Sequence, residues 1–283
     1  MKSYYSEVEL NINNKLKITK PLALVVDDYH TIFDFISKDF SRLSNKKMIS
    51  ENVILIFYSI HINFERLIEN LLLLNYDICF KILRTIIEQI IIFTSLCNND
   101  ESMAYYFINW DLLANINDYS FKKVGKDYQL CKNDLDNFIK LKCSHDTKKA
   151  DKVIKDLIKN NYGWYYKKWD FKSDLNLYKI AEQEKILDIY DLFRKYSLNI
   201  HNNKLRTILK QNKYEVKYGC RVVIGLFKSL SSILKVLQKI TISEDQELIP
   251  VEDVDVLIYS KLAESIIEQN EQILKDEEKN TEN

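Results

Sequence analysis

The chain has 283 residues, enough for one large domain or two small ones. Hydrophobic residues make up 46% of it, but there are only 4 glycines and 2 prolines, so the composition argues against turn-rich sheet folds and predicts long helices with short links. The 41 basic and 41 acidic side chains balance to zero net charge. This balance does not indicate a general electrostatic attraction to nucleic acid, but it leaves room for a local basic patch.

Apolar residues recur at helical spacing along most of the chain after a polar lead-in over 1–20. The predicted fold class is therefore all-α, a multi-helix bundle with one helical domain over 21–242 and a C-terminal extension over 243–283. This extension comprises an acidic loop, a last amphipathic helix and a frayed tail. The helices within the domain are predicted at about 21–43, 52–75, 77–96 and 101–124, and then at 175–184, 186–201 and 216–240. Between these two groups, two modest helices are predicted around Asp146.

The segment 77–96 is hydrophobic nearly all round, which is typical of a buried central helix. Within it, Arg84 and Glu88 have the i, i+4 spacing that permits an ion pair. The pair is either a structural strut or the floor of a binding pocket, since charges in so apolar a helix need hydrogen-bonding partners. The pair should be partly desolvated, and if it lies against the helix predicted at 186–201, removing Arg84 should cost about 3–5 kcal/mol by leaving Glu88 unpaired.

Four polar residues at spacings of four, three and four, Tyr190, Arg194, Ser197 and His201, share one face of the helix predicted at 186–201. An apolar seam runs beside them and should face the core: Ile189, Phe193, Tyr196 and Ile200. Polar groups at the edge of a buried surface must find partners there or take part in chemistry. We therefore expect Arg84 and Glu88 to lie within bonding reach of Tyr190, Ser197 or His201.

His201 is either an imidazole stabilised by the C-terminal helix dipole or a general acid/base. The cations that follow, among them Lys204, Arg206 and Lys210, form either a solvated face or a phosphate-binding rim. Aromatic residues gather over 163–173, where anchoring of the loop is favoured over base stacking: Trp164, Tyr165, Tyr166 and Trp169.

No metal site or cofactor is expected, because the five cysteines are widely spaced and no P-loop, G-x-G-x-x-G or H-E-x-x-H pattern is present. Reduced thiols, a polar N-terminus without a signal-peptide core and short apolar stretches predict a cytoplasmic protein without membrane contact.

Two runs, LLNYDICFKILRTIIEQ and WDFKSDLNLYKIAEQEKILDIYDLFRKYSLNIHNN, resemble the signatures of the bacterial domain of unknown function numbered five-six-seven-seven. The first contains its L-R-x-x-x-E pattern with Arg84 and Glu88. The second contains a Trp followed by Y-x₆-S-x₃-H, here Trp169, Tyr190, Ser197 and His201. The resemblance covers roughly residues 50–205 and implies an all-helical intracellular protein with no established activity.

Arg194 and His201 also resemble the R-x₄₋₆-H motif of HEPN domains at its long limit, although Lys195 stands where HEPN proteins usually carry another polar residue. This implies a metal-independent endoribonuclease or toxin-type effector, possible in antiviral (abortive infection) defence. It would be a homodimer that acts on RNA, with Arg194, Ser197 and His201 as catalytic candidates and an antitoxin or other partner protein unidentified. The alternative is a non-catalytic binding or interaction module with a polar pocket built from Arg84, Glu88, Tyr190, Ser197 and His201.

Overall fold

The computed structural model describes residues 19–46, 49–99, 101–114, 126–168, 175–201, 214–242 and 251–282. Over these ranges the chain is helical and contains no strand, which confirms the all-α prediction. The elements are α2 (Thr19–Asn45), α3 (Glu51–Leu72), α4 (Tyr76–Cys97), α5 (Glu101–Ala114), α6 (Lys126–Lys142), α7 (Thr147–Ile158), the short 3₁₀ helix η1 (Gly163–Tyr165), α8 (Leu177–Gln183), α9 (Leu187–His201), α11 (Tyr214–Ile242) and α12 (Val251–Glu282).

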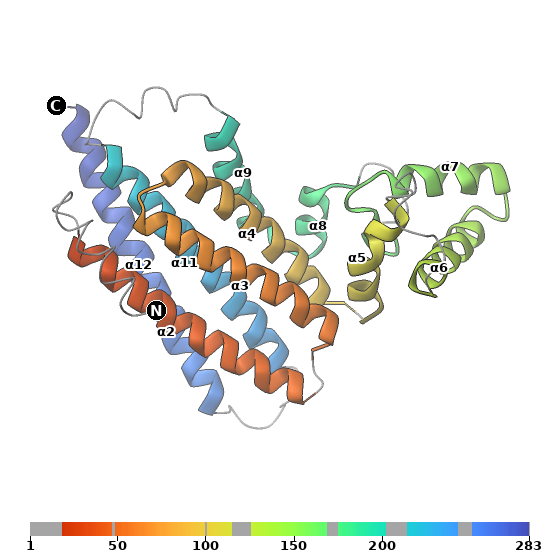
Figure 1. Cartoon of the computed structure of the whole chain (residues 1–283), viewed down its shortest axis with the longest axis horizontal. Coiled ribbons are helices and arrows are strands. Elements are labelled where there is room, and N and C mark those ends of the chain that lie inside the picture. Colours follow the sequence, from red (N-terminus) through yellow and green to blue (C-terminus); the bar gives the residue numbers. More distant parts are fainter. Residues whose placement is uncertain are drawn as a thin grey trace.

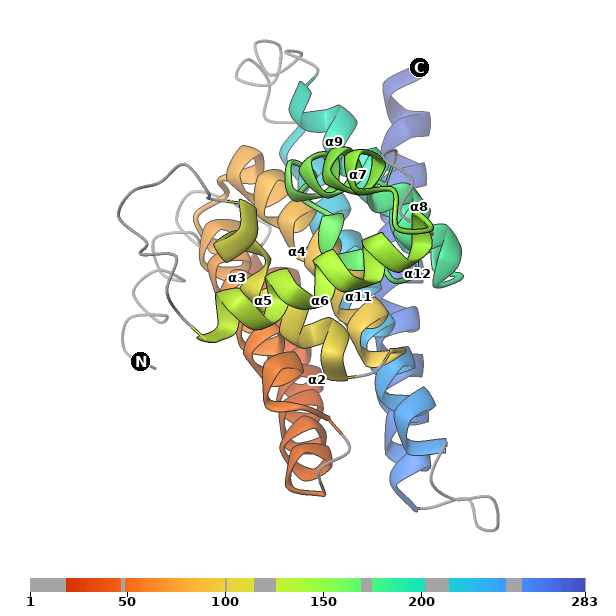
Figure 2. The same ribbon diagram turned by 90° about the vertical axis from the view of Figure 1, so that its right-hand side faces the viewer.

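The long helices form an elongated bundle, and a smaller group of helices stands to one side of it (Figure 1). The bundle consists of α2, α3, α4, α9, α11 and α12. The side lobe consists of α5, α6, α7 and η1, and α8 lies between the two parts and packs on α4 and α9. Figure 2 views the molecule from the side of the lobe, with α6 and α7 in front of the bundle.

Helix α4 is the central helix that the sequence predicts. It packs against α3, α9 and α11 on different sides. Its apolar residues from Cys79 to Leu96 are buried, apart from the partly buried Ile82. Phe93 illustrates this position, because its ring contacts the rings of both Phe40 in α2 and Phe57 in α3. A helix that is apolar on nearly every face is stable only when neighbours cover it in this way.

Residues close to each end of α3 determine where this helix begins and ends. Ser50 is the N-cap and its side chain accepts a hydrogen bond from the Val53 amide, as expected for a serine at this position. At the other end, Leu74 has a positive φ of 58°, which ends the helix earlier than the predicted Asn75. Asn75 instead lies at the N-cap position of α4, where its side chain makes no capping bond. The two helices are therefore joined by a tight link.

Helix α9 is held against α11 by a close approach at a glycine. The buried Tyr196 hydroxyl donates to the Arg221 carbonyl oxygen at 2.5 Å. A Cβ atom at Gly225 would lie 2.4 Å from that hydroxyl oxygen, so only glycine leaves room for the Tyr196 ring in this position. The apolar seam predicted for α9 thus faces the core at Ile189 and Tyr196.

The remaining predictions concern helix boundaries, the cysteines and membrane-spanning segments. Asp146 is the N-cap of α7 and lies between α6 and α7, the two modest helices predicted around it. Helix α5 is described as far as Ala114, and its predicted end near residue 124 lies outside the described residues. Helix α12 extends through Glu282, so the segment predicted as a frayed tail is helical. The five cysteines all lie in the described residues and none of them forms a disulfide. Among the described helices none has the length and apolarity to cross a bilayer.

Candidate functional site

The predicted ion pair on α4 is present but is only partly buried. Arg84 Nη1 lies 3.4 Å from Glu88 Oε2, and the two side chains are 36% and 25% exposed. The pair is therefore partly desolvated, as its position in an apolar helix predicts. Both residues lie on the edge of α4, away from the fully covered face that carries Leu83 and Ile87. The charges remain in contact with water, and the pair borders an open face of the molecule.

The partner of Arg84 on α9 is an aromatic ring. The guanidinium carbon lies 4.8 Å from the centroid of the Phe193 ring, a cation–π contact. Phe193 stacks on Tyr190 at 5.7 Å, and Tyr190 meets Tyr178 of α8 edge-on at 5.2 Å. These three rings form an aromatic column that ends at Arg84. We call the surface made by Arg84, Glu88, Tyr178, Tyr190 and Phe193 the α4–α9 face.

The structure thus brings Tyr190 to the same surface as Arg84 and Glu88, although no hydrogen bond joins the charged pair to the α9 stripe among the described residues. Glu88 binds elsewhere: its Oε1 accepts a hydrogen bond from the Tyr162 hydroxyl at 2.7 Å. Burial, and next the hydrogen bond to Glu88, raise the pKa of Tyr162 well above its ordinary value. Tyr162 therefore stays a protonated donor at any physiological pH.

Tyr162 belongs to a short segment that sends three phenol hydroxyls to three carboxylates. Tyr162 donates to Glu88 of α4, Tyr165 to Glu184 after α8, and Tyr166 to Asp134 of α6. Trp164, Tyr165 and Tyr166 are buried, which agrees with anchoring of the aromatic loop and not with base stacking. Sequence reasoning identified the anchor but missed the carboxylates, because partners up to 74 residues apart leave no local pattern.

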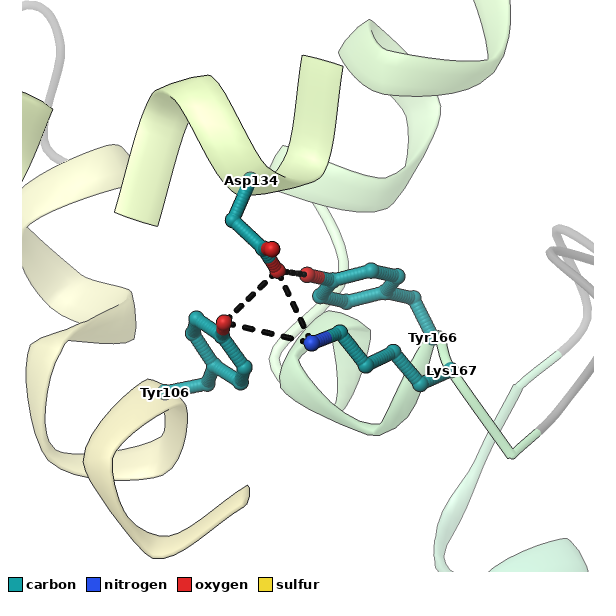
Figure 3. Close-up of polar contacts among 4 residues, drawn as sticks. All are labelled: Tyr106, Asp134, Tyr166 and Lys167. Atoms are coloured by element: carbon teal, nitrogen blue, oxygen red, sulfur yellow. Dashed lines mark hydrogen bonds and ion pairs between the residues drawn. The ribbon is translucent and has the colours of Figure 1, made fainter. Parts of the chain in front are cut away.

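The Asp134 end of this segment is a compact polar cluster in the side lobe (Figure 3). Asp134 Oδ2 accepts hydrogen bonds from Tyr106 at 2.6 Å and Tyr166 at 2.8 Å, and it pairs with Lys167 Nζ at 2.9 Å. Burial alone would raise the pKa of Asp134, but the hydrogen bonds from Tyr106, Lys167 and Tyr166 lower it overall. Because one carboxylate oxygen already accepts from three donors, the cluster has a structural role and connects α5, α6 and η1.

The remaining members of the α9 stripe differ in their surroundings. Arg194 is 65% exposed and its nearest carboxylate, Asp191, is 4.0 Å away. The Ser197 hydroxyl is buried and has no hydrogen-bond partner among the described residues. His201 is the last residue of α9, and its side chain lies outside the described part of the structure. Four further candidates also lie outside the described residues: Trp169, Lys204, Arg206 and Lys210.

Two hollows lie away from the α4–α9 face. A groove of about 540 Å³ between α9, α11 and α12 has side chains of both charges, among them Lys195, Lys228 and Glu268. A hollow of about 690 Å³ lies where the ends of α2, α3, α4 and α11 meet. In the described part of the chain, no group of three or more His, Cys, Asp or Glu side chains has the arrangement of a metal site.

The comparison with known families agrees with the two sequence signatures. The model of a family of unknown function (DUF5677) matches residues 53–214, more than half of the chain. The matched range includes both α4 and α9, and it ends where α11 begins. No curated protein and no solved structure matches this chain. The chain belongs to the family of unknown function DUF5677.

Proposed function

We propose that this chain is a helical binding module and that its α4–α9 face takes a nucleotide unit, either free or within an RNA strand. The observation that carries the proposal is the state of Arg84. Its guanidinium is spread over the Phe193 ring, is one-third exposed, and makes a single long contact with Glu88. Among the described residues it has no other ion pair or hydrogen bond, so most of its N–H donors point to solvent or to a ligand.

The chemistry of the neighbouring residues suits a nucleotide. Arginine is the side chain best matched to phosphate, because its planar fork donates two parallel hydrogen bonds. Aromatic rings stack on nucleobases, and Tyr178 is the outermost and most exposed ring of the column. Glu88 can accept hydrogen bonds from the N–H groups of a base edge. A phosphate near Arg84 and a base near Tyr178 would use the two ends of the aromatic column.

The test is a binding titration of the full chain with adenosine and guanosine monophosphates and with a short single-stranded RNA. Arg84→Ala should weaken binding of every phosphate-bearing probe by about tenfold, the effect of losing one charge-assisted interaction. Arg66→Ala is the matched control, because Arg66 is an exposed arginine of α3, a helix that does not pack against α9. Absence of binding by the wild type, or equal binding by the Arg84→Ala variant, would overturn the proposal.

A second candidate is a HEPN-like, metal-independent endoribonuclease or toxin-type effector in antiviral defence, acting in the cytoplasm. The observation in its favour is that Arg194 is exposed and lies one turn from Tyr190 on the same edge of α9. Arg194 would stabilise charge on the phosphorane and His201 would transfer a proton. A homodimer that brings two copies of α9 together would place two Arg194 and two His201 side chains around one phosphodiester.

A further inference from the structure

We propose that Tyr162 is a positioning residue of the α4–α9 face: its hydroxyl holds the Glu88 carboxylate and thereby keeps the Arg84 guanidinium available for an anionic ligand. This inference rests on the proposed function of that face. It assigns a role to a residue that contributes no side chain to the aromatic column. It also explains why an arginine and a glutamate one turn apart remain loosely paired.

The distances around Glu88 show which partner is the stronger. The Tyr162 hydroxyl lies 2.7 Å from Oε1, a short hydrogen bond of the kind that a carboxylate accepts from a phenol. Arg84 Nη1 lies 3.4 Å from Oε2, longer than a charge-assisted hydrogen bond between a guanidinium and a carboxylate. The carboxylate is thus oriented by Tyr162 and not by Arg84. A freely rotating Glu88 could instead form a bidentate pair with Arg84 and occupy its donors.

The side lobe fixes Tyr162 independently of α4. The Tyr162 amide donates to Asn160 Oδ1 at 2.8 Å, and Asn160 Nδ2 donates to the Leu175 carbonyl oxygen at 2.7 Å. The next residue, Gly163, lies so close to the Trp110 ring that a Cβ atom there would overlap it. The backbone that carries Tyr162 is therefore held on both sides, and its hydroxyl is delivered to Glu88 from a fixed position.

Removal of the hydroxyl in Tyr162→Phe should let Glu88 turn onto Arg84 and compete with the ligand for the guanidinium. Binding of adenosine monophosphate should then weaken about fivefold, the effect of one hydrogen bond exchanged for another. The matched control is Tyr166→Phe, which removes a hydroxyl from the same segment but one that binds Asp134 of α6 in the side lobe. Its affinity for the nucleotide should equal that of the wild type.

A second background separates positioning from a structural role. In Glu88→Gln the side chain carries no charge to compete for Arg84, so adding Tyr162→Phe should leave the dissociation constant of that variant unchanged. An equal loss of affinity in both backgrounds would overturn the inference, because Tyr162 would then act by contact with the ligand or through the fold. Unchanged binding by Tyr162→Phe, with Arg84→Ala still impaired, would also overturn it and leave the proposed function intact. Unimpaired binding by Arg84→Ala would remove the proposed function itself.

Discussion

The Tyr165 hydroxyl donates a hydrogen bond to Glu184 Oε1 at 2.5 Å and so joins the aromatic segment to the turn between α8 and α9. The same carboxylate accepts hydrogen bonds from Ser95 at 3.3 Å, and from Asn98 and Asn99 at 3.0 Å each, at the C-terminal end of α4. Glu184 therefore connects three parts of the chain close to the point where α9 begins. The position of α9 beside α4 depends on this junction.

Glu184→Gln should destabilise the protein by about 1–3 kcal/mol, because one acceptor oxygen is replaced by an amide that meets donors already in place. Urea unfolding followed by circular dichroism measures the loss. Glu182→Gln is the control two residues away, since Glu182 is exposed and its side chain accepts a hydrogen bond from the exposed Tyr178 hydroxyl. A Glu184→Gln loss no larger than that of Glu182→Gln would show that the junction contributes little.

Gly225→Ala should destabilise the protein by about 1–3 kcal/mol, the usual cost of overpacking a core. The new Cβ atom would lie 2.4 Å from the Tyr196 hydroxyl oxygen and 2.7 Å from its ring carbon Cζ, and the buried ring has little space to move. Gly219→Ala in the same helix is the control. The nearest atom to its Cβ would be 3.4 Å away, so the gain in helix propensity, about 0.5–1 kcal/mol, should dominate. Thermal unfolding should therefore shift in opposite directions.

Acid should remove the contribution of Asp134 to stability. Because hydrogen bonds hold the pKa of this carboxyl below its ordinary value, the folded state binds its proton less readily than the unfolded state. The contribution is therefore fully present above about pH 4, the unfolded pKa of an aspartate, and is lost as pH falls further through the folded pKa.

The measurement compares the free energy of unfolding of wild type and Asp134→Asn from pH 7 to pH 3, so that other carboxyl groups cancel. The difference between the two proteins should be constant above about pH 5 and shrink below about pH 4. A difference that grows on acidification would contradict the assignment. Since Asp134 is 41% exposed, solvent screening keeps the whole effect small.

Arg84→Ala should cost about 1 kcal/mol of stability, less than a buried pair would require. Glu88 keeps its hydrogen bond to Tyr162 and its contact with water when Arg84 is removed. The variant loses a partly exposed ion pair and the contact with the Phe193 ring. Each of these interactions contributes about 1 kcal/mol or less at such positions. Urea unfolding would contradict this account if it gave a loss above about 3 kcal/mol, the cost of an unpaired buried charge.

Sequence patterns could predict what depends on local spacing. The apolarity of 77–96 on nearly every face predicts a central helix, which is α4. The i, i+4 spacing of Arg84 and Glu88 predicts their ion pair. Each of these features is determined within a few residues, where helix geometry alone decides which side chains meet.

The partners of those residues could not be predicted in the same way. Tyr162 reaches Glu88 from 74 residues away, and Tyr196 fits against Gly225 only because two helices pack closely. The contact of Arg84 with the Phe193 ring could not be predicted for a related reason. An apolar sequence implies a covered helix, but how far each edge remains open depends on where α9 and the side lobe end.

The endoribonuclease candidate predicts RNA cleavage that requires His201 and Arg194 but no metal ion. Purified wild type should cleave single-stranded RNA in the presence of a chelator, and expression should inhibit growth. His201→Ala should abolish both effects without changing the circular dichroism spectrum, because His201 is the candidate proton-transfer group at the end of α9.

Arg206→Ala and Lys210→Ala should weaken RNA binding and flatten its salt dependence, since each phosphate contact contributes counterion release. Lys155→Ala, a change in α7 of the side lobe, is the control that leaves the salt dependence unaltered. Equal cleavage by wild type and folded His201→Ala, or no cleavage by either while RNA is bound, would end the nuclease interpretation and leave the binding module.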